Sequence, residues 1–190
     1  TFSTADIAAI GPSAIRGLKT AIIAGLTTDD IKVLTPAQVG GLGYNQIATL
    51  TTAQVDALST MQLGALNAIQ TAALGTDDIA LFTTEDIAAL GTSGVAGLTT
   101  SVIAALTTAQ SEALTPAQVG ALTASQVGSL SKDNIAKFST ADIAAFSSAG
   151  VQGLSTDTLV SLSSQQIDTL LNTHMGALTP TQVSAIIGSY

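Results

Sequence analysis

Apolar residues recur at a fixed interval of eight along the whole chain. Every eighth residue from 2 to 186 is Leu, Ile or Phe, and no insertion or deletion interrupts the series. With units that start at residue 3, residues 3–186 form 23 complete octads, and partial units stand at both ends. The fifth position of the octad is also apolar, except where Thr71 and Ser111 stand. We therefore expect one continuous tandem-repeat array over residues 1–190.

The octad consensus, close to T-T-A-Q-I-A-A-L, predicts one short helix per unit. The first position is Ser or Thr in 16 of 23 octads, and the fourth is Gln, Asp or Asn in 16 of 23. This spacing is a capping box, in which two side chains satisfy free N–H groups at a helix start. Pro36, Pro116 and Pro180 take the second position, where a missing N–H does no harm. Positions 5 and 8 then share one helical face.

A single long helix and a strand both fit the pattern poorly. Eight residues of helix leave the apolar stripe about 80° out of step per unit, and a recurring Thr-Pro would interrupt the helix. Apolar residues three apart do not alternate as they do in a strand. Helices this short are unstable alone, so neighbouring units must stabilise one another by stacking. The predicted fold is all-α, a superhelical solenoid of very short helices.

The number of octads in one superhelical coil stays open between two and three. Neither the glycines at position 1 nor the prolines show a clean second-order period. The small residues at positions 6 and 7 would allow coils to approach closely. We expect right-handed winding, as is usual in helical solenoids.

Composition narrows the classes of partner. Mean hydropathy is +0.50, but apolar runs such as residues 102–106 are far shorter than the roughly 20 residues that span a bilayer, so we expect a soluble chain. The net charge is −8 with five Lys and Arg, which disfavours nucleic acid and anionic membranes. No cysteine is present for a disulfide framework. The chain begins and ends within octads, so we expect a fragment of a longer array whose ends associate with each other.

The acidic pairs are the first candidates for chemistry. Asp29-Asp30, Asp77-Asp78 and Glu85-Asp86 all occupy positions 3 and 4 of their octads. In the first turn of a short helix they complement the helix dipole and complete the cap. No D-x-D-x-D-G loop is present, and weak Ca²⁺ binding at the pairs stays open. We therefore predict no catalytic, cofactor-binding or metal-binding residue.

His174 takes the fourth position of octad 171–178, where Gln is usual, and we expect it to face solvent. A hydroxyl nucleophile needs a base, and His174 is the only histidine, so we expect no enzyme activity. Octads 19–26 and 67–74 shift apolar residues off the pattern, which local repacking explains. Of the two tyrosines, Tyr44 is expected to be half-exposed; the other is Tyr190.

Residues 35–42 (TPAQVGGL) and 51–58 (TTAQVDAL) resemble the octad arrays of giant bacterial cell-surface proteins of the adhesin-like kind. The resemblance covers the whole chain. Similar phrases occur in mesothelin-like superhelical proteins of animal cell surfaces. The resemblance implies an extracellular or cell-surface location and a scaffold or adhesive role. Departures at Thr71, Ser111 and Leu171 argue against a designed, uniform consensus.

These observations favour a non-catalytic structural role without cofactors. The first hypothesis is a spacer or stalk segment of a large secreted or cell-surface protein, with neighbouring repeats as its partners. The alternative is a binding module, in which one face of the solenoid recognises a protein or a glycan. Ice binding is disfavoured because capping already explains the recurring threonines, and enzyme activity is the last choice.

Overall fold

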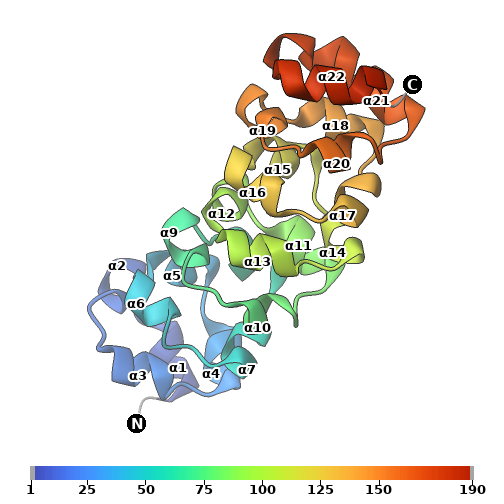
Figure 1. Ribbon diagram of the computed structural model, residues 1–190. Coiled ribbons are helices and arrows are strands. Elements are labelled where there is room, and N and C mark those ends of the chain that lie inside the picture. The colour runs from blue at the N-terminus through green and yellow to red at the C-terminus, as the bar shows by residue number, and fades with distance from the viewer. Residues whose placement is uncertain (1–2, 189–190) are drawn as a thin grey trace. The chain divides into compact units, whose positions relative to one another are not determined.

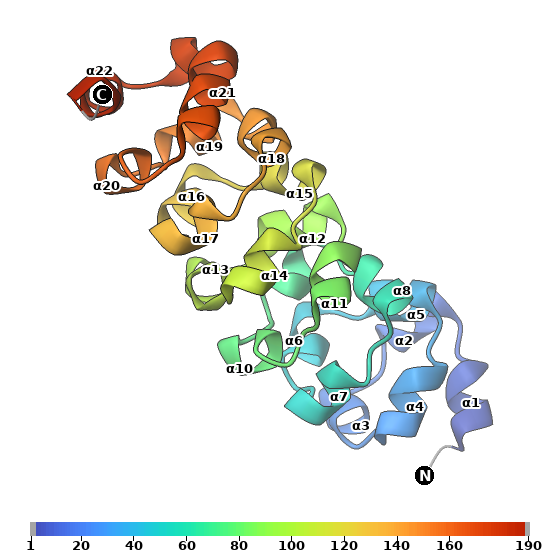
Figure 2. The same cartoon turned by 90° about the vertical axis from the view of Figure 1, so that its right-hand side faces the viewer.

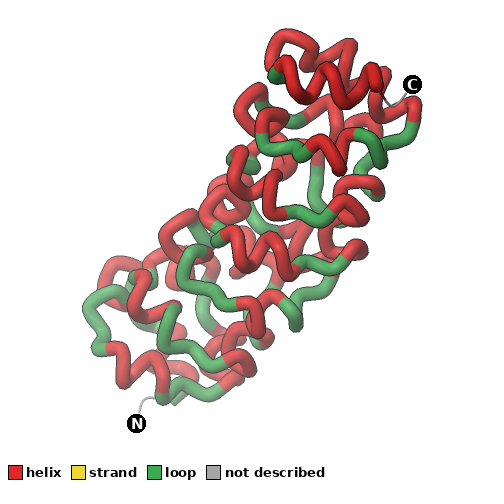
Figure 3. Tube along the Cα trace, in the orientation of Figure 1, coloured by secondary structure: helices red, strands yellow, loops and turns green. Residues whose placement is uncertain are grey.

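In the computed structural model, which describes residues 3–188, short helices follow one another along the chain without any strand. Figure 3 shows each helix as a brief segment joined to the next by an irregular linker. From residue 3 onward each octad contributes one helix, with a single exception near the C-terminus. The prediction of an all-α solenoid with one short helix per repeat is confirmed. Phe2 and Tyr190 lie outside the described residues.

The contacts group the chain into two compact units, residues 1–98 and 99–190. The expectation of one continuous array across both stays a prediction. The helices of the first unit are α1 (Thr4–Ala8), α2 (Pro12–Ile15), α3 (Thr20–Ala24), α4 (Thr28–Val33), α5 (Pro36–Gly41), α6 (Tyr44–Ile47), α7 (Thr52–Asp56), α8 (Thr60–Gly64), α9 (Ala68–Thr71), α10 (Thr76–Ile79), α11 (Thr84–Ala89) and α12 (Thr92–Gly97).

The second unit repeats the same organisation. Its helices are α13 (Thr100–Ala105), α14 (Thr108–Glu112), α15 (Pro116–Ala121), α16 (Ala124–Ser129), α17 (Lys132–Ala136), α18 (Thr140–Ala145), α19 (Ser148–Gln152), α20 (Thr156–Leu159), α21 (Ser164–His174), the 3₁₀ turn η1 (Met175–Ala177) and α22 (Pro180–Gly188).

Helix starts follow the predicted capping box. In α5 the backbone N–H of Thr35 donates to Gln38 Oε1 at 2.7 Å, and the N–H of Gln38 donates to Thr35 Oγ1 at 3.2 Å. Pro36 stands between them at the first helical position. The two side chains thus satisfy N–H groups that a helix start leaves without partners.

Helix ends need no left-handed residue. Leu34 closes its octad with φ −60° and ψ 135°, and Thr35 opens the next with φ −72° and ψ 155°. Two successive extended residues interrupt the helix and redirect the chain. No residue in 3–188 has a positive φ, glycine included. None of the described glycines is therefore required by a left-handed turn.

Positions 5 and 8 form the core, as their spacing predicts. Ile31 is fully buried and Leu34 is 3% exposed, and the same pair of positions is buried in octad after octad. Because both face inward from every helix, the core runs along the inside of each unit. Burial of such side chains is the main source of stability for helices this short.

Within each unit, helices pack on the helix three octads further along. In the first unit α1 contacts α4, α2 contacts α5 and α3 contacts α6, and in the second α13, α14 and α15 contact α16, α17 and α18. One coil therefore takes three octads, which settles the choice between two and three. Figures 1 and 2 show the resulting layers, with α1, α4 and α7 side by side in the first unit. Right-handed winding stays a prediction.

The exception to one helix per octad is α21, which runs through the boundary between residues 170 and 171. Leu171 stands where other octads carry a capping Ser or Thr, so it offers no side-chain acceptor to start a new helix. The helix continues to His174 and ends in η1. The prediction of a separate short helix for octad 171–178 is wrong for this reason.

Glycines at position 7 set the closest approach between coils. A Cβ added at Gly41, Gly97 or Gly153 would fall far inside van der Waals contact with a backbone carbonyl oxygen of the preceding coil. The three carbonyls belong to Pro12, Ala68 and Ala124. The three glycines are 56 residues apart, a spacing of seven octads. The close approach of coils predicted for small residues at this position is therefore confirmed at these three glycines.

Candidate functional site

The fourth position of the octad joins one coil to the next. Gln62 is 1% exposed, and its Oε1 accepts from the backbone N–H of Ser59 at 2.7 Å. Its Nε2 donates to two carbonyl oxygens of the preceding coil, Ile31 O at 2.8 Å and Leu34 O at 2.7 Å. Those carbonyls lie at the end of α4, where a helix leaves C=O groups without partners. One side chain thus caps the start of its own helix and the end of another.

The same bridge recurs wherever Gln occupies this position within a unit. The donor nitrogen reaches the carbonyls 31 and 28 residues earlier in each case. The glutamines that do so, besides Gln62, are Gln38, Gln46, Gln54, Gln70, Gln166 and Gln182. Asn134, one methylene shorter, bonds only Leu106 O, at 3.1 Å. We call this set of bonds the glutamine bridge.

Aspartate at the same position caps its own helix but donates no hydrogen bond to the carbonyls of the preceding coil. Asp30 Oδ2 accepts from Thr27 N at 2.9 Å and from Thr27 Oγ1 at 2.8 Å. Asp78 accepts from Gly75 N, and Asp86 from Thr83 N and Oγ1. A carboxylate has no N–H to donate, so it cannot reach the carbonyls of the preceding coil. The predicted capping role of the acidic pairs is confirmed for these second members.

The first members of the acidic pairs have different surroundings. Asp29 forms an exposed ion pair with Lys32 Nζ at 3.1 Å, and Glu85 accepts from Thr84 Oγ1 at 3.1 Å. The backbone N–H of Glu85 itself and the Thr84 hydroxyl lower the pKa of that carboxyl. The N–H and hydroxyl of Thr27 lower the pKa of Asp30 in the same way. The described residues contain no group of three or more His, Cys, Asp and Glu that could hold a metal ion.

His174 stands at the fourth position, where other octads carry Gln, and its side chain also takes the place of Gln in bonding the preceding coil. Its side chain is half-buried, and Nε2 lies 3.1 Å from the carbonyl oxygen of Ile143, 31 residues earlier. A carbonyl only accepts, so this nitrogen carries the proton. The expectation that His174 faces solvent is wrong, because the position points toward the preceding coil whatever residue fills it.

The irregular octad 67–74 is explained by its neighbour one coil later. Thr71, fully buried at position 5, donates its hydroxyl to Gly94 O at 2.7 Å. A Cβ at Gly97 would collide with Ala68 and with the Thr71 hydroxyl, so glycine there lets α12 come close to α9. Local repacking is thus confirmed for this octad. Ser111, the other polar residue at position 5, is fully buried, and its hydroxyl has no partner in the part of the chain described.

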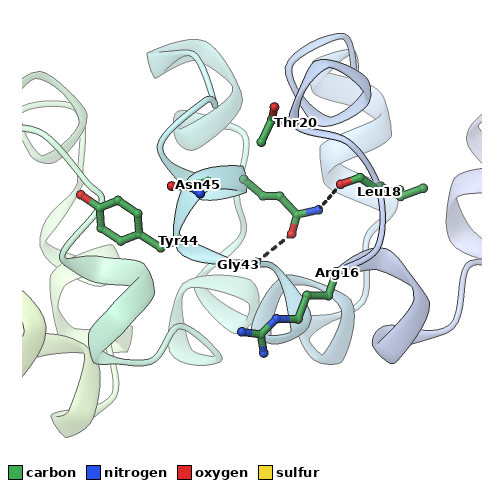
Figure 4. A pocket seen from close by; sticks show the side chains of 7 residues that line it. Arg16, Leu18, Thr20, Gly43, Tyr44 and Asn45 are labelled. Carbon is green, nitrogen blue, oxygen red and sulfur yellow. Dashed lines mark hydrogen bonds between the residues drawn. The ribbon is translucent and has the colours of Figure 1, made fainter.

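A pocket of about 410 Å³ lies in the first unit, between α2 and α3 on one side and α6 on the other. Figure 4 shows Tyr44 and Asn45 on α6, Arg16 at the end of α2 and Thr20 at the start of α3. Gln46 lies at its base, bonded to Gly43 N at 2.7 Å and to Leu18 O at 2.8 Å. The Tyr44 ring is 47% exposed, as predicted for a half-exposed ring.

Among the residues that the structure covers, no helix is long and apolar enough to cross a membrane. No curated protein matches the sequence. A family model described as the ALTTAQ repeat matches five stretches, residues 2–36, 23–60, 71–108, 79–116 and 135–172, which together cover well over half of the chain. The name itself contains the octad phrase A-L-T-T-A-Q that joins position 7 of one unit to position 4 of the next. The chain therefore belongs to the ALTTAQ repeat family.

Proposed function

We propose that this structural repeat segment is a non-catalytic spacer or scaffold in a large secreted or cell-surface protein of the adhesin-like kind. The observation that carries the proposal is the glutamine bridge. Wherever Gln stands at the fourth position within a unit, it attaches its octad to the preceding coil through backbone carbonyls, by the same bonds each time. An element of this kind can be extended by whole coils without a new design at each step. Length is the property that a spacer supplies.

The side chains that could take part in acid–base chemistry or metal binding form hydrogen bonds within the fold. Asp30, Asp78 and Asp86 cap helices, and His174 bonds a carbonyl of the preceding coil. Supporting evidence for the cell-surface setting is the resemblance of the octads to those of giant surface proteins. A spacer that holds binding domains away from a cell needs resistance to extension, and bonds between successive coils provide it.

The spacer role predicts that length grows by one fixed step for each added coil. We would duplicate residues 139–162, three octads within the second unit, in a chain labelled with two dyes at Lys132→Cys and Met175→Cys. The chain has no native cysteine, so both labels are specific. Energy transfer should report an increase of about 9–10 Å, the separation of packed helix layers. Duplication of a single octad is the control. One octad is a third of a coil, so it moves the second label around the solenoid axis and not by a full step along it.

An unchanged dye separation after the three-octad duplication would contradict the spacer role. The location is tested separately, with antibodies against this segment applied to intact cells that produce the chain. Labelling without permeabilisation is expected. Labelling that needs permeabilised cells would contradict the secreted or cell-surface setting.

A further inference from the structure

The pocket beside Tyr44 is lined by residues that are unusual for their positions in the octad. No other octad has Arg at its sixth position, Tyr at its second or Asn at its third. Arg16, Tyr44 and Asn45 carry these three departures, and all three line the same pocket although 28 residues separate the first two. Most structural needs of a repeat array recur in every unit, and where they do not, as at Thr71 and Gly97, a packing or hydrogen-bonding partner is present. A cluster of unique residues from two octads therefore indicates a role beyond the scaffold.

The polar groups around the pocket are not used by the fold. Arg16 is exposed and forms no ion pair with any residue in 3–188. The Tyr44 hydroxyl and the side chains of Asn45 and Thr20 likewise have no hydrogen-bond partner among those residues. Gln46, 4% exposed at the base, is held by Gly43 N, Leu18 O and Ile15 O. The pocket thus combines a fixed base with four groups available to a ligand.

The electrostatic setting favours an anion. The chain carries 13 Asp and Glu, yet residues 7–28 and 31–55 contain none of them. The three octads that form the pocket, residues 11–26 and 43–50, contain no acidic residue, although the octads next to them in sequence carry Asp6, Asp29, Asp30 and Asp56. Arg16 therefore keeps its positive charge available in a protein whose net charge is −8. A guanidinium binds a carboxylate by two parallel hydrogen bonds.

We propose that this pocket binds an acidic sugar at the end of a glycan. Arg16 takes the carboxylate, and the Tyr44 ring offers a flat apolar surface to one face of the sugar. Asn45 and Thr20 bond the ring hydroxyls, because both can donate and accept. The volume of about 410 Å³ is near the lower end for ligand pockets and suits one sugar ring better than a folded peptide segment. The site goes beyond the spacer role and does not depend on it.

The test is a titration of the ¹⁵N-labelled chain with glucuronic acid, followed by amide chemical shifts. We expect shifts at Arg16, Gly43 and Asn45 and affinity at least about tenfold weaker for neutral glucose. Added salt should weaken the binding of glucuronic acid much more than that of glucose. Arg16→Gln and Tyr44→Ala should each lower the affinity for glucuronic acid about tenfold. Both residues are exposed, so unchanged circular dichroism will show that the variants fold.

Lys32→Gln is the matched control, because Lys32 is an exposed cation already paired with Asp29 outside the pocket. It should leave glucuronic acid binding unchanged. The proposal is overturned if glucuronic acid gives no shifts, if glucose binds equally well, or if acetate binds as tightly as the acidic sugar. It is also overturned if an acidic peptide binds the pocket while the sugar does not.

Discussion

Two neighbouring stretches of the first unit, residues 35–74 and 75–98, use different side chains against the preceding coil. In residues 35–74 the fourth position is Gln in all five octads, and each Gln donates to carbonyls of that coil. In residues 75–98 the position holds Asp78, Asp86 and Gly94. Yet both stretches form the same short helices and bury the same positions 5 and 8. The core and the caps therefore suffice for the fold.

The difference shows that attachment between coils is a separate property, which the fourth position controls. Glutamine donates hydrogen bonds to backbone carbonyls of the preceding coil, and aspartate has no N–H with which to do so. Glycine provides a third solution, since α12 packs close to α9 and Gly94 O accepts from the Thr71 hydroxyl. Substitutions at a single fourth position should therefore change the strength of attachment between coils without changing the fold.

The largest effect is expected from Gln62→Glu. The substitution keeps the acceptor for Ser59 N but places a buried carboxylate against the carbonyls of Ile31 and Leu34. The free energy of unfolding should fall by about 3–5 kcal/mol at neutral pH, as expected for an unpaired buried charge. Urea unfolding measures it. Asp86→Glu, where the position is already acidic, should change stability by less than about 1 kcal/mol; equal losses at both sites would contradict the comparison.

Gly97→Ala should have the next largest effect. The new Cβ meets backbone and side-chain atoms of Ala68 and Thr71, so α12 must move away from α9. We expect a loss of about 1–3 kcal/mol in the free energy of unfolding, typical of an overpacked site. Gly176→Ala is the control, since nothing lies within 4 Å of an added Cβ there. A melting temperature that falls equally in both variants would argue against close packing at Gly97.

Asp78→Gln should convert a cap into a bridge. The introduced amide would keep the acceptor for Gly75 N and donate toward the carbonyls of Ile47 and Leu50, which stand 31 and 28 residues earlier. We expect a gain of about 0.5–1.5 kcal/mol in the free energy of unfolding. Slower hydrogen exchange in α6 and α10 would locate the gain. Asp77→Gln, at the adjacent third position, should produce neither change.

The smallest effect is expected on the free energy of unfolding at acidic pH. The pKa of Asp30 in the folded chain lies below its ordinary value of 3.8, because Thr27 donates to the carboxylate. This cap therefore stabilises the fold fully above that value, and its contribution is lost as pH falls through the lowered pKa. Asp30→Asn should reduce the difference in unfolding free energy between neutral pH and about pH 2.5. Gln38→Asn, where no proton is bound or released, should leave that difference unchanged.

Features set within one octad could be predicted from the sequence. A hydroxyl at position 1 and an acceptor three residues later define a helix start, and Ile31 and Leu34 three residues apart define its buried face. The presence of Pro36 at the first helical position also follows from local chemistry, because a missing N–H does no harm there. These interactions join residues close in the chain, so the pattern of one unit contains them.

Features that depend on the preceding coil could not be predicted in the same way. Within its own octad, the capping box explains the hydrogen bond that Gln62 Oε1 accepts. Nothing in that octad indicates which atom Nε2 would bond. The signal was the preference for Gln over Asp, since both cap but only Gln donates. His174 was misjudged for the same reason. The pocket was missed because Arg16 and Asn45 stand in different octads, and only the packing of successive coils brings them to one pocket.

The glutamine bridge bonds backbone carbonyls, and every residue has one, whatever its side chain. An octad that carries Gln at its fourth position can therefore attach to any octad placed beneath it, without a matched substitution there. A gene that encodes such units can lengthen or shorten by duplication and unequal recombination, and each new arrangement is already compatible at its junctions. Compensating mutations are needed only where glycines and their partners pack closely, as at Gly97 and Ala68.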